Sequence, residues 1–416
     1  MTSPAQDIVI IGAGIVGINA AAFLAEAGHR VRVFDPAGIA EMTSRGNAAA
    51  LAFSDIIPLA SPKTLLRAPK WLFDPLGPLT IRPSYLPKLT PWLLRFAMAS
   101  IPGQVTASAA AQAKLMKLAE SEATALWTRT GLTKMIRHEG SLELYQSEAE
   151  FNTAQSDWEK RAKAGIEFEH VRGNRLAELQ PGLSSQFSAA TFVPGWKTVS
   201  EPFHYALGIW NYAASYGASF EQVSVDRLEF AGSKPIALLA NGTSVKADKI
   251  IIAAGAWSTK LLKTASRVKI PLDTERGYNT TLPAAAFDLK RQLIFPSHGF
   301  VITPLENGVR VGGAVEFAGL DAPPNYARAE AMLKKASNFL PGLDPSGGKQ
   351  WMGFRPSLPD SLPVMAPLPD REDVILAFGN GHLGLTQSAA MGKLTLDLVT
   401  GNKPAFDLAP LAANRF

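Results

Sequence analysis

Apolar runs, a glycine cluster and polar breaks succeed one another in the first part of the chain. The pattern predicts a strand over residues 8–11, a helix that ends at Gly28, and a second strand over residues 31–34. A strand, a helix and a parallel strand form a βαβ unit, so the predicted fold class is α/β with a Rossmann-like opening. Between the first strand and the helix lie three glycines: Gly12, Gly14 and Gly17.

The following stretch, residues 71–91, is rich in proline and lacks clear periodicity, which predicts an irregular excursion. Thr90 is a favourable N-cap and Pro91 suits a first turn, so a short helix is predicted over residues 91–101. This helix is apolar almost all round, and it is far shorter than the ~20 residues that cross a bilayer. It is therefore either buried or lying flat in a membrane surface, and both interpretations stay open.

Helices and strands alternate through the middle of the chain. Asn307 and Gly308 suit a turn with positive φ, so the apolar runs 300–303 and 309–315 predict a β-hairpin. These strands indicate a mixed antiparallel sheet, distinct from the parallel opening. The other predicted elements are helices over residues 107–130, 148–164 and 202–216 and strands over residues 141–145, 191–193 and 249–253.

The opening pattern returns near the end of the chain. A strand over residues 374–378 leads through a glycine-rich loop into a helix over residues 385–400. The loop is formally a second dinucleotide triplet, but the helix runs nearly to the chain end and leaves no strand and no acid for a ribose. We therefore expect the helix N-terminus to face an electron-rich group, and no nicotinamide site is implied.

Composition narrows the possible partners. The 416 residues are enough for two domains, and the formal charge of +5 is spread without a lysine or arginine run, which argues against a nucleic-acid partner. Cysteine is absent, which excludes disulfides, thiolate zinc sites and a flavin attached through sulfur, and we expect no metal site. The first strand begins by Asp7, which leaves no room for a cleaved signal peptide, so a cytoplasmic location is expected.

The first glycine cluster has the chemistry of a dinucleotide site. Gly12 permits a tight turn, Gly14 lets the main chain approach a pyrophosphate, and Gly17 lets the helix pack closely on the strand. The N-terminus of the helix offers unpaired N–H groups to phosphate. Asp35, just after the second strand, would accept a hydrogen bond from a ribose hydroxyl.

Further motifs follow in a specific order and cover nearly the whole chain. Beside the glycine cluster with Asp35 they are residues 43–48 (Thr-Ser-Arg-Gly-Asn-Ala), 68–71 (Ala-Pro-Lys-Trp), 78–83 (Pro-Leu-Thr-Ile-Arg-Pro), 253–258 (Ala-Ala-Gly-Ala-Trp-Ser), 275–278 (Glu-Arg-Gly-Tyr), 353–360 (Gly-Phe-Arg-Pro-Ser-Leu-Pro-Asp) and 381–384 (Gly-His-Leu-Gly). Together they resemble the FAD-dependent amino acid oxidoreductases related to D-amino acid oxidase, most closely the bacterial D-amino acid dehydrogenase small-subunit type.

The resemblance implies a Rossmann-like FAD-binding domain and a second, mixed antiparallel-sheet α+β substrate domain, similar to D-amino acid oxidase. The FAD-binding domain would be assembled from residues 1–75, 196–265 and 345–416, and the substrate domain from residues 76–195 and 266–344. FAD is the implied cofactor, since a flavin held by one such fold takes a hydride directly from a bound substrate.

The resemblance also implies the cofactor contacts. Ser44, Asn47 and Ala48 lie in a loop that would pass near the pyrophosphate and the flavin, although the residues alone fit a surface turn equally well. Main-chain N–H groups around His382 would stabilise negative charge on the reduced flavin. The other implied cofactor contacts are Ile15, Val16, Val225 at the adenine, Gly255, Trp257, Gly381, Leu383, Gly384 and Leu385.

Three residues are implied to act on the substrate. Arg355 would pair with a substrate α-carboxylate through two parallel N–H bonds, unless it forms a structural pair with Asp360. Tyr278 would lie over the substrate and donate to the same carboxylate, and a buried core tyrosine is the competing interpretation. His298 would face the pocket from before the hairpin, whereas a lone histidine in a loop is more often structural.

The implied activity is oxidative deamination of a D-amino acid to the 2-oxo acid and ammonia, by hydride transfer from Cα to the flavin. Electrons would pass to a quinone or respiratory acceptor, which the apolar helix and the positive charge suit through peripheral contact with the inner face of the cytoplasmic membrane. An oxygen-using oxidase and a dehydrogenase of hydroxyproline or another secondary amino acid stay open. A flavin subunit that relays electrons without binding substrate is a further alternative, against which Arg355 argues.

Overall fold

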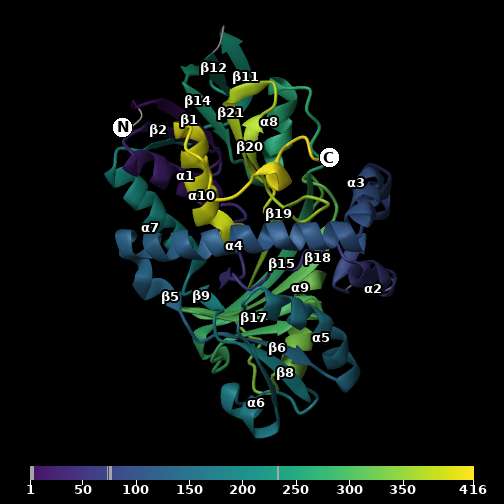
Figure 1. Cartoon of the computed structure of the whole chain (residues 1–416). Helices are drawn as coiled ribbons and strands as arrows, with labels where there is room; N and C mark the ends of the chain where they lie inside the picture. The colour runs from purple at the N-terminus through teal and green to yellow at the C-terminus, as the bar shows by residue number, and fades with distance from the viewer. Residues whose placement is uncertain (1–3, 73, 75–76, 232–233) are drawn as a thin grey trace.

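The computed structural model describes residues 4–72, 74, 77–231 and 234–416, and two large β-sheets occupy its two halves (Figure 1). The long helix α4 (Pro102–Thr130) crosses between the halves. It ends at Thr130, as predicted, with Gly131 next in the left-handed conformation, although it begins before the predicted residue 107. The α/β opening and the separate mixed sheet confirm the predicted fold class.

One sheet has six strands, which lie in the order β10 (Ser219–Glu221), β2 (Arg30–Phe34), β1 (Asp7–Ile11), β14 (Lys249–Ile252), β21 (Arg371–Phe378) and β20 (Val364–Leu368). The first five are parallel, and β20 pairs antiparallel with β21. Side chains of β1 alternate between two cores, because successive residues of a strand point to opposite faces. Ile8 and Ile10 belong to one core, and Val9 and Ile11 to the other.

Helices cover one face of this sheet and a small sheet covers the other. The first core is completed by helices α1 (Ile15–Glu26), α7 (Pro202–Ser215) and α10 (Gly384–Thr400). The second is completed by the sheet of β11 (Val225–Ala231), β12 (Lys234–Leu239) and β13 (Ser244–Lys246) and by helix α8 (Ser258–Ala265). The predicted opening unit and the predicted return at the C-terminus therefore lie in one sheet.

The other large sheet has nine strands. Eight follow the order β19 (Lys349–Ser357), β15 (Asp273–Pro283), β18 (Gly308–Phe317), β17 (Phe300–Leu305), β16 (Gln292–Phe295), β6 (Ser141–Tyr145), β8 (Ala189–Val193) and β7 (Glu169–Arg172), and β4 (Leu79–Ile81) pairs with β18. All pairs are antiparallel except β16 with β6 and β4 with β18, so the sheet is mixed, as predicted. The hairpin at Asn307-Gly308 is confirmed, since Leu305 pairs with Gly308.

Helices α9 (Ala327–Phe339) and α6 (Gly173–Leu179) share a core with this sheet, and α5 (Glu148–Lys163) packs near β6 and β8. A third short sheet joins β3 (Ala50–Leu51), β9 (Lys197–Val199) and β5 (Ile136–Arg137). Short 3₁₀ helices are η1 (Pro83–Tyr85), η2 (Leu132–Met135), η3 (Gly255–Trp257), η4 (Ala284–Ala286) and η5 (Ala409–Leu411). Strand β19 pairs only within the nine-stranded sheet, although the predicted domain limit at residue 345 groups it with the other half; the domain limits stay a prediction.

The region predicted as an irregular excursion is more regular than expected. It holds the end of α2 (Pro62–Leu72), then β4 and helix α3 (Leu86–Ala99), whereas residues 73, 75 and 76 lie outside the described part. The predicted helix start at Pro91 is wrong, because Pro87 takes the first turn and the Thr90 hydroxyl donates to the Leu86 carbonyl at 2.8 Å instead of capping.

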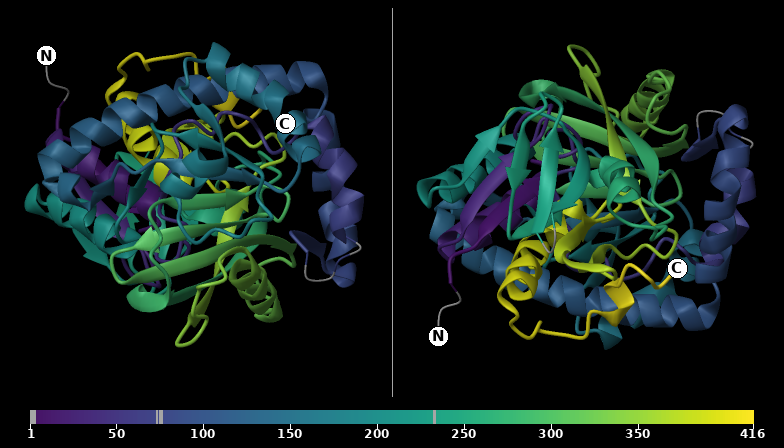
Figure 2. Two further views of the ribbon diagram at one scale, coloured as in Figure 1. Left: turned by 90° about the horizontal axis from the view of Figure 1, so that it is seen from below. Right: turned by 90° about the horizontal axis from the view of Figure 1, so that it is seen from above.

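Helix α3 is also much less buried than a helix that is apolar all round usually is. Only Leu89 and Trp92 are buried, so full burial is excluded. Figures 1 and 2 show α2 and α3 side by side at one edge of the molecule. None of the helices in the described part of the chain is long and apolar enough to cross a membrane.

Candidate active site

A cavity of about 1170 Å³ lies where the two large sheets meet. Residues at the carboxyl ends of the parallel strands β1, β2, β14 and β21 form one wall, which is where open α/β sheets bind ligands. The opposite wall is a face of the nine-stranded sheet, from β19 to β6. A ligand in this cavity can therefore contact both halves at once.

The glycines before α1 have the backbone roles that the sequence predicts. Gly12 has φ of 110°, and a Cβ there would lie 2.4 Å from the Ala253 carbonyl oxygen. A Cβ on Gly17 would lie 2.0 Å from the Gly12 oxygen, so this residue serves the packing of helix on strand and does not line the cavity. Gly14, Ile15 and Val16 do line it.

Two polar side chains order this N-terminus. Asp35 accepts from Ala13 N at 2.9 Å and from Ala37 N at 2.8 Å, and it lines the cavity. Each carboxylate oxygen has a second lone pair, so Asp35 can still accept from a ribose hydroxyl. The Ser44 hydroxyl accepts from Ile15 N at 2.9 Å. The positive end of the α1 dipole thus faces the cavity with its first turn held in place.

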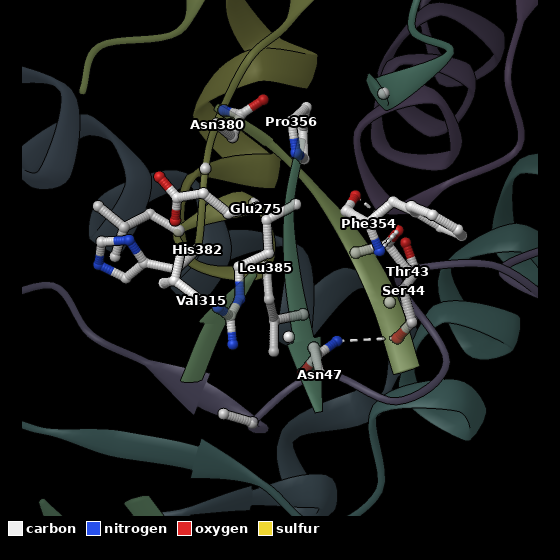
Figure 3. A pocket seen from close by; sticks show the side chains of 18 of the residues that line it. Thr43, Ser44, Asn47, Glu275, Val315, Phe354, Pro356, Asn380, His382 and Leu385 are labelled. Carbon is white, nitrogen blue, oxygen red and sulfur yellow. Dashed lines mark hydrogen bonds between the residues drawn. The ribbon is translucent and has the colours of Figure 1, made fainter. Parts of the chain in front are cut away.

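The loop of residues 43–48 is bound to the nine-stranded sheet, which excludes the surface-turn interpretation. Asn47 closes the loop itself, since its amide donates to the Ser44 carbonyl at 2.8 Å and accepts from Ala49 N (Figure 3). Gly46, Asn47 and Ala48 offer their carbonyls to the sheet. The donors are Asn279 at 2.7 Å, Arg310 at 2.6 Å, Gln292 at 3.0 Å and Thr303 at 3.1 Å.

The loop before α10 lines the cavity from another side. Helix α10 begins at Gly384, and no described side chain caps it, so its first N–H groups remain available to a ligand. The His382 ring lies 3.3 Å from Asp55. Burial opposes ionisation of Asp55, but His382 and Arg161 outweigh it and lower the Asp55 pKa. The predicted residues of this loop that line the cavity are Gly381, His382, Leu383, Gly384 and Leu385.

Three further predicted cofactor contacts line the same cavity: Val225, Gly255 and Trp257. The Trp257 ring packs edge-on against Phe354 of β19 at 5.3 Å. Ala48 and Asn47 complete the set, so of the predicted cofactor contacts only Gly17 does not line the cavity. A two-sided cradle with two helix N-termini and an acid fits a dinucleotide in shape and charge.

Arg355 lines the cavity and is free of acidic partners. Its guanidinium donates to the Ala314 carbonyl at 2.7 Å, and no described carboxylate lies within 4.0 Å of it. Burial lowers the Arg355 pKa, which a nearby acid, Glu275, partly offsets. The alternative pairing is wrong, because Asp360 is bound by Arg415 at 2.6 Å. Arg355 therefore keeps donors for an anionic ligand.

Tyr278 is buried, and its hydroxyl bonds to groups other than Arg355. It donates to Glu316 at 2.5 Å and accepts from Asn325 N at 3.1 Å. Tyr278 also lines the cavity, so its predicted place beside the substrate stays a prediction, although Glu316 and Asn325 already occupy its hydroxyl. Burial raises the Tyr278 pKa, and Glu316 raises it further.

His298 does not reach the cavity. Its Nε2 lies 2.7 Å from the Gln146 amide oxygen, and its ring packs on Phe339 at 4.8 Å. Its absence from the cavity wall removes it from the candidate site, because the turn before β17 directs the ring toward α9. The structural alternative for this histidine holds.

Glu275 was missed as a site residue, although its motif was recognised. It is 5% exposed, lines the cavity, and lies directly across from Arg355 in the pairing of β15 with β19. Sequence offered one signal: Glu275 and Gly277 share a strand face, as do Gly353 and Arg355. The strand face that carries Gly277 also carries Glu275, and this alternation predicts Glu275 beside Arg355.

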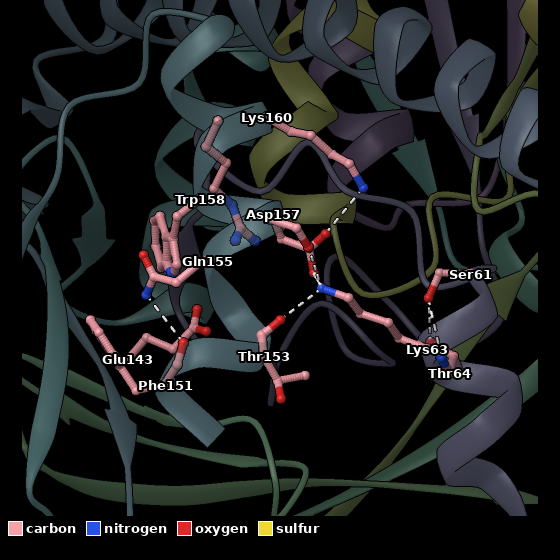
Figure 4. A network of polar contacts seen from close by, with 12 residues as sticks. Ser61, Lys63, Thr64, Glu143, Phe151, Thr153, Gln155, Asp157, Trp158 and Lys160 are labelled. Atoms are coloured by element: carbon pink, nitrogen blue, oxygen red, sulfur yellow. Dashed lines mark hydrogen bonds and ion pairs between the residues drawn. The ribbon is translucent and has the colours of Figure 1, made fainter. Parts of the chain in front are cut away.

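The far end of the cavity is polar as well. Glu143 of β6 and Arg161 of α5 line it, and the Arg161 guanidinium lies 4.5 Å from the Trp158 ring centroid. Burial raises the Glu143 pKa. Lys63 of α2 bridges to α5, with Nζ at 2.8 Å from Asp157 and 2.9 Å from the Thr153 carbonyl (Figure 4). This bridge holds α2 across one side of the cavity.

Comparison with known proteins agrees with this architecture. The family model for FAD dependent oxidoreductases matches residues 7–398. The chain belongs to this family. FAD is accordingly the cofactor of this oxidoreductase, and the cradle at α1 is suited to hold it. In the described part of the chain no group of three or more His, Cys, Asp or Glu side chains could hold a metal ion.

Two relatives match the oxidoreductase over almost its full length. A D-amino-acid oxidase of Bradyrhizobium diazoefficiens is 32% identical, and a D-amino acid dehydrogenase of Allorhizobium ampelinum is 28% identical, each over 99% of both chains. The crystal structure of glycine oxidase from Geobacillus kaustophilus has a TM-score of 0.75 at 22% identity and covers 99% of both chains. That structure shows the shared fold.

Proposed function

We propose that this flavoenzyme oxidises an α-amino acid, and that Arg355 holds the substrate α-carboxylate. The observation that carries the proposal is a half-buried guanidinium in the cavity wall whose one hydrogen bond within the described chain goes to a carbonyl. Partial burial already disfavours this cation, as its lowered pKa indicates, and it has no acidic partner within the described chain, so the site suits an anion that arrives with the ligand. The names of both relatives support an amino acid as that ligand.

Bound FAD supplies a two-electron acceptor for the hydrogen on the substrate Cα. The chain contributes position: a bidentate contact from Arg355 fixes both the place and the tilt of the carboxylate. The Ala314 carbonyl in turn holds the guanidinium over β15. The imino acid that leaves the site hydrolyses in water to the 2-oxo acid and ammonia.

We further propose a D-amino acid as substrate and a quinone as electron acceptor, because a dehydrogenase is among the full-length relatives. A second candidate is an oxidase that uses oxygen, which the name of the 32% identical relative favours. Anaerobic bleaching of the yellow protein by D- and L-amino acids, D-proline and 4-hydroxy-D-proline tests the substrate. Recolouring in air indicates an oxidase, and recolouring only after a quinone is added indicates a dehydrogenase.

Helices α2 and α3 support contact with an anionic membrane surface from which such a quinone would come. Their exposed apolar residues include Leu66 at 82%, Leu94 at 64% and Met98 at 61%. Neither helix contains Asp or Glu, and both carry lysine and arginine. Other residues of both helices line the cavity. We expect sedimentation with vesicles that contain phosphatidylserine, and a Leu66→Ser, Leu94→Ser variant should stay in the supernatant.

The decisive test of the carboxylate site is Arg355→Lys. A lysine keeps the charge but loses the planar pair of donors, so KM for amino acids should rise about 10-fold or more while flavin content stays normal. Arg227→Lys, in an exposed pair with Glu229, is the control and should leave KM unchanged. An unchanged KM in Arg355→Lys would remove Arg355 from the site.

A further inference from the structure

Glu275 and Arg355 are opposite charges on paired residues that nevertheless do not form an ion pair. They face each other across β15 and β19, where Cβ atoms of directly opposed residues lie ~5 Å apart. Both line the cavity, and Glu275 is 5% exposed. Even so, no guanidinium nitrogen of Arg355 lies within 4.0 Å of a carboxylate oxygen of Glu275. In a buried site an arrangement of this kind is unusual, because each charge lacks its nearest available partner.

Neutral groups hold the two charges apart. Arg355 reaches from β19 across β15 to the Ala314 carbonyl of β18, and it lies so close over Gly277 that a Cβ there would be 2.3 Å from its Nη2. Glu275 reaches the other way, from β15 back to β19, where the Ser357 hydroxyl donates to its Oε1 at 2.6 Å. Arg355 is thus held on the far side of β15, and Glu275 is held at β19.

The arrangement leaves acceptor capacity on Glu275 that is directed to the cavity. No hydrogen bond within the described chain reaches its Oε2, whereas an ionised carboxylate offers about four lone-pair sites. Figure 3 shows Glu275 on the side of the cavity where Asn380 and His382 lie. The other buried acid of this region, Glu316, already accepts from Tyr278 and Arg82.

We propose that Glu275 binds the substrate amino group, so that Arg355 and Glu275 together form a receptor for the zwitterion of an α-amino acid. The inference rests on the proposed carboxylate site at Arg355. Glu275 then selects amino acids over hydroxy acids and simple carboxylates, because its charge attracts an ammonium and repels a ligand that is only an anion. Gly277 makes room for the guanidinium, and Ser357 keeps the carboxylate from collapsing onto it.

A matched pair of ligands tests the proposal without turnover. 2-Aminoisobutyrate has no hydrogen on Cα and cannot be oxidised, and isobutyrate is the same skeleton without the amino group. Calorimetric titration of the holoenzyme should show tighter binding of 2-aminoisobutyrate. In the Glu275→Gln variant, the Kd of 2-aminoisobutyrate should rise about 10- to 100-fold, whereas the Kd of isobutyrate should fall below its value in the parent enzyme. Opposite changes for the two ligands are not expected from a merely structural role.

Further variants separate the possible failures. Arg355→Lys should weaken both ligands; if it leaves isobutyrate unaffected, or if neither ligand binds the parent, the carboxylate site itself is wrong. If Arg355→Lys weakens the binding of both ligands but Glu275→Gln leaves the Kd of each ligand unchanged, only the amino-group role of Glu275 is overturned. Glu275→Asp keeps the charge and should keep the preference for 2-aminoisobutyrate, which also covers the case of an unstable glutamine variant. Loss of the preference in Glu275→Asp with retained folding would contradict the charge-based selection.

Discussion

The strands β15, β18 and β19 carry two sets of arginine and acid, and the two sets are arranged in opposite ways. Beside the loop before α9, Glu316 is 1% exposed and accepts from Arg82 at 3.1 Å and from Tyr278 at 2.5 Å, with Arg276 at 3.8 Å. On the cavity side, Arg355 and Glu275 lie across from each other unpaired. The same residue types thus occur once as a closed network and once as an open one.

The difference shows how one sheet separates stability from binding. A closed buried network satisfies its own charges, so its members stabilise the fold and offer little to a ligand. We propose that the open pair, held by neutral groups, keeps its charges for a ligand. Mutations on the two sides should therefore act on different properties.

The largest expected effect is the loss of Arg276. In Arg276→Met, Glu316 loses its fully buried cation and the carbonyls of Gly319 and Pro323 lose a donor, which should destabilise the protein by about 3–5 kcal/mol. Arg355→Met, on the open side, removes no ion pair and should cost far less. Urea unfolding of the two holoproteins measures the contrast, and equal midpoints would contradict the division between the two sides.

Tyr278→Phe tests the division on the closed side alone. The lost hydrogen bond to the buried Glu316 should lower the free energy of unfolding by about 1.5–3 kcal/mol. KM for the amino acid should stay within about twofold, since the hydroxyl is already occupied by Glu316 and Asn325. A strong rise in KM with unchanged stability would restore Tyr278 as a substrate contact. Tyr216→Phe, at the exposed C-cap that follows α7, serves as a control.

Glu143, a third charged group in the cavity wall, should make the stability of the protein depend on pH. Burial raises the Glu143 pKa despite the opposing effects of Arg161 and Tyr145, so the folded state binds more protons than the unfolded state above pH 4.5. Stability from this group therefore falls as pH rises from 4.5. Glu143→Gln cannot titrate, and its gain in unfolding midpoint over the parent should be larger at pH 7 than at pH 4. Glu159→Gln, exposed on the same helix as Arg161, should show no such difference.

The smallest expected effect comes from the exposed bridge at Lys63. Lys63→Met removes the contacts to Asp157, Ser156 and the Thr153 carbonyl, and should change global stability by less than about 1 kcal/mol. Amide hydrogen exchange should nevertheless speed up within α2 while β1 stays protected. Lys70→Met on the same helix is the control. Equal exchange in both variants would mean that the bridge does not hold α2.

Local signals explain what the sequence could predict. The strand, the glycines, the helix and Asp35 lie within 35 residues, and each depends on neighbours in the chain, so their positions at the cavity follow. The boundaries of β6 and the turn of the hairpin were likewise set by short-range patterns. The start of α3 could not be predicted in this way, since Pro87 and Pro91 each suit the first turn of a helix and only the tertiary packing selects between them.

The substrate wall was harder to predict because it depends on which way a strand faces. A shift of one residue exchanges Arg276 for Glu275 on the cavity side. A register shift interrupts the pairing of β15 with β18 between Arg276 and Tyr278, and no sequence periodicity marks it. The direction of the His298 ring depends on the turn before β17 in the same way.

The bonds from the nine-stranded sheet to the loop of residues 43–48 have a consequence for changing this protein's chemistry by design. Gln292 and Thr303 support Ala48 from the cavity floor, although they belong to strands far from the glycines. Replacing Gln292 or Thr303 to make room for a larger substrate would remove hydrogen bonds that hold the cofactor loop of residues 43–48. The range of substrates and the retention of the flavin are therefore linked. A library of variants selected for new substrates should also be screened for flavin content.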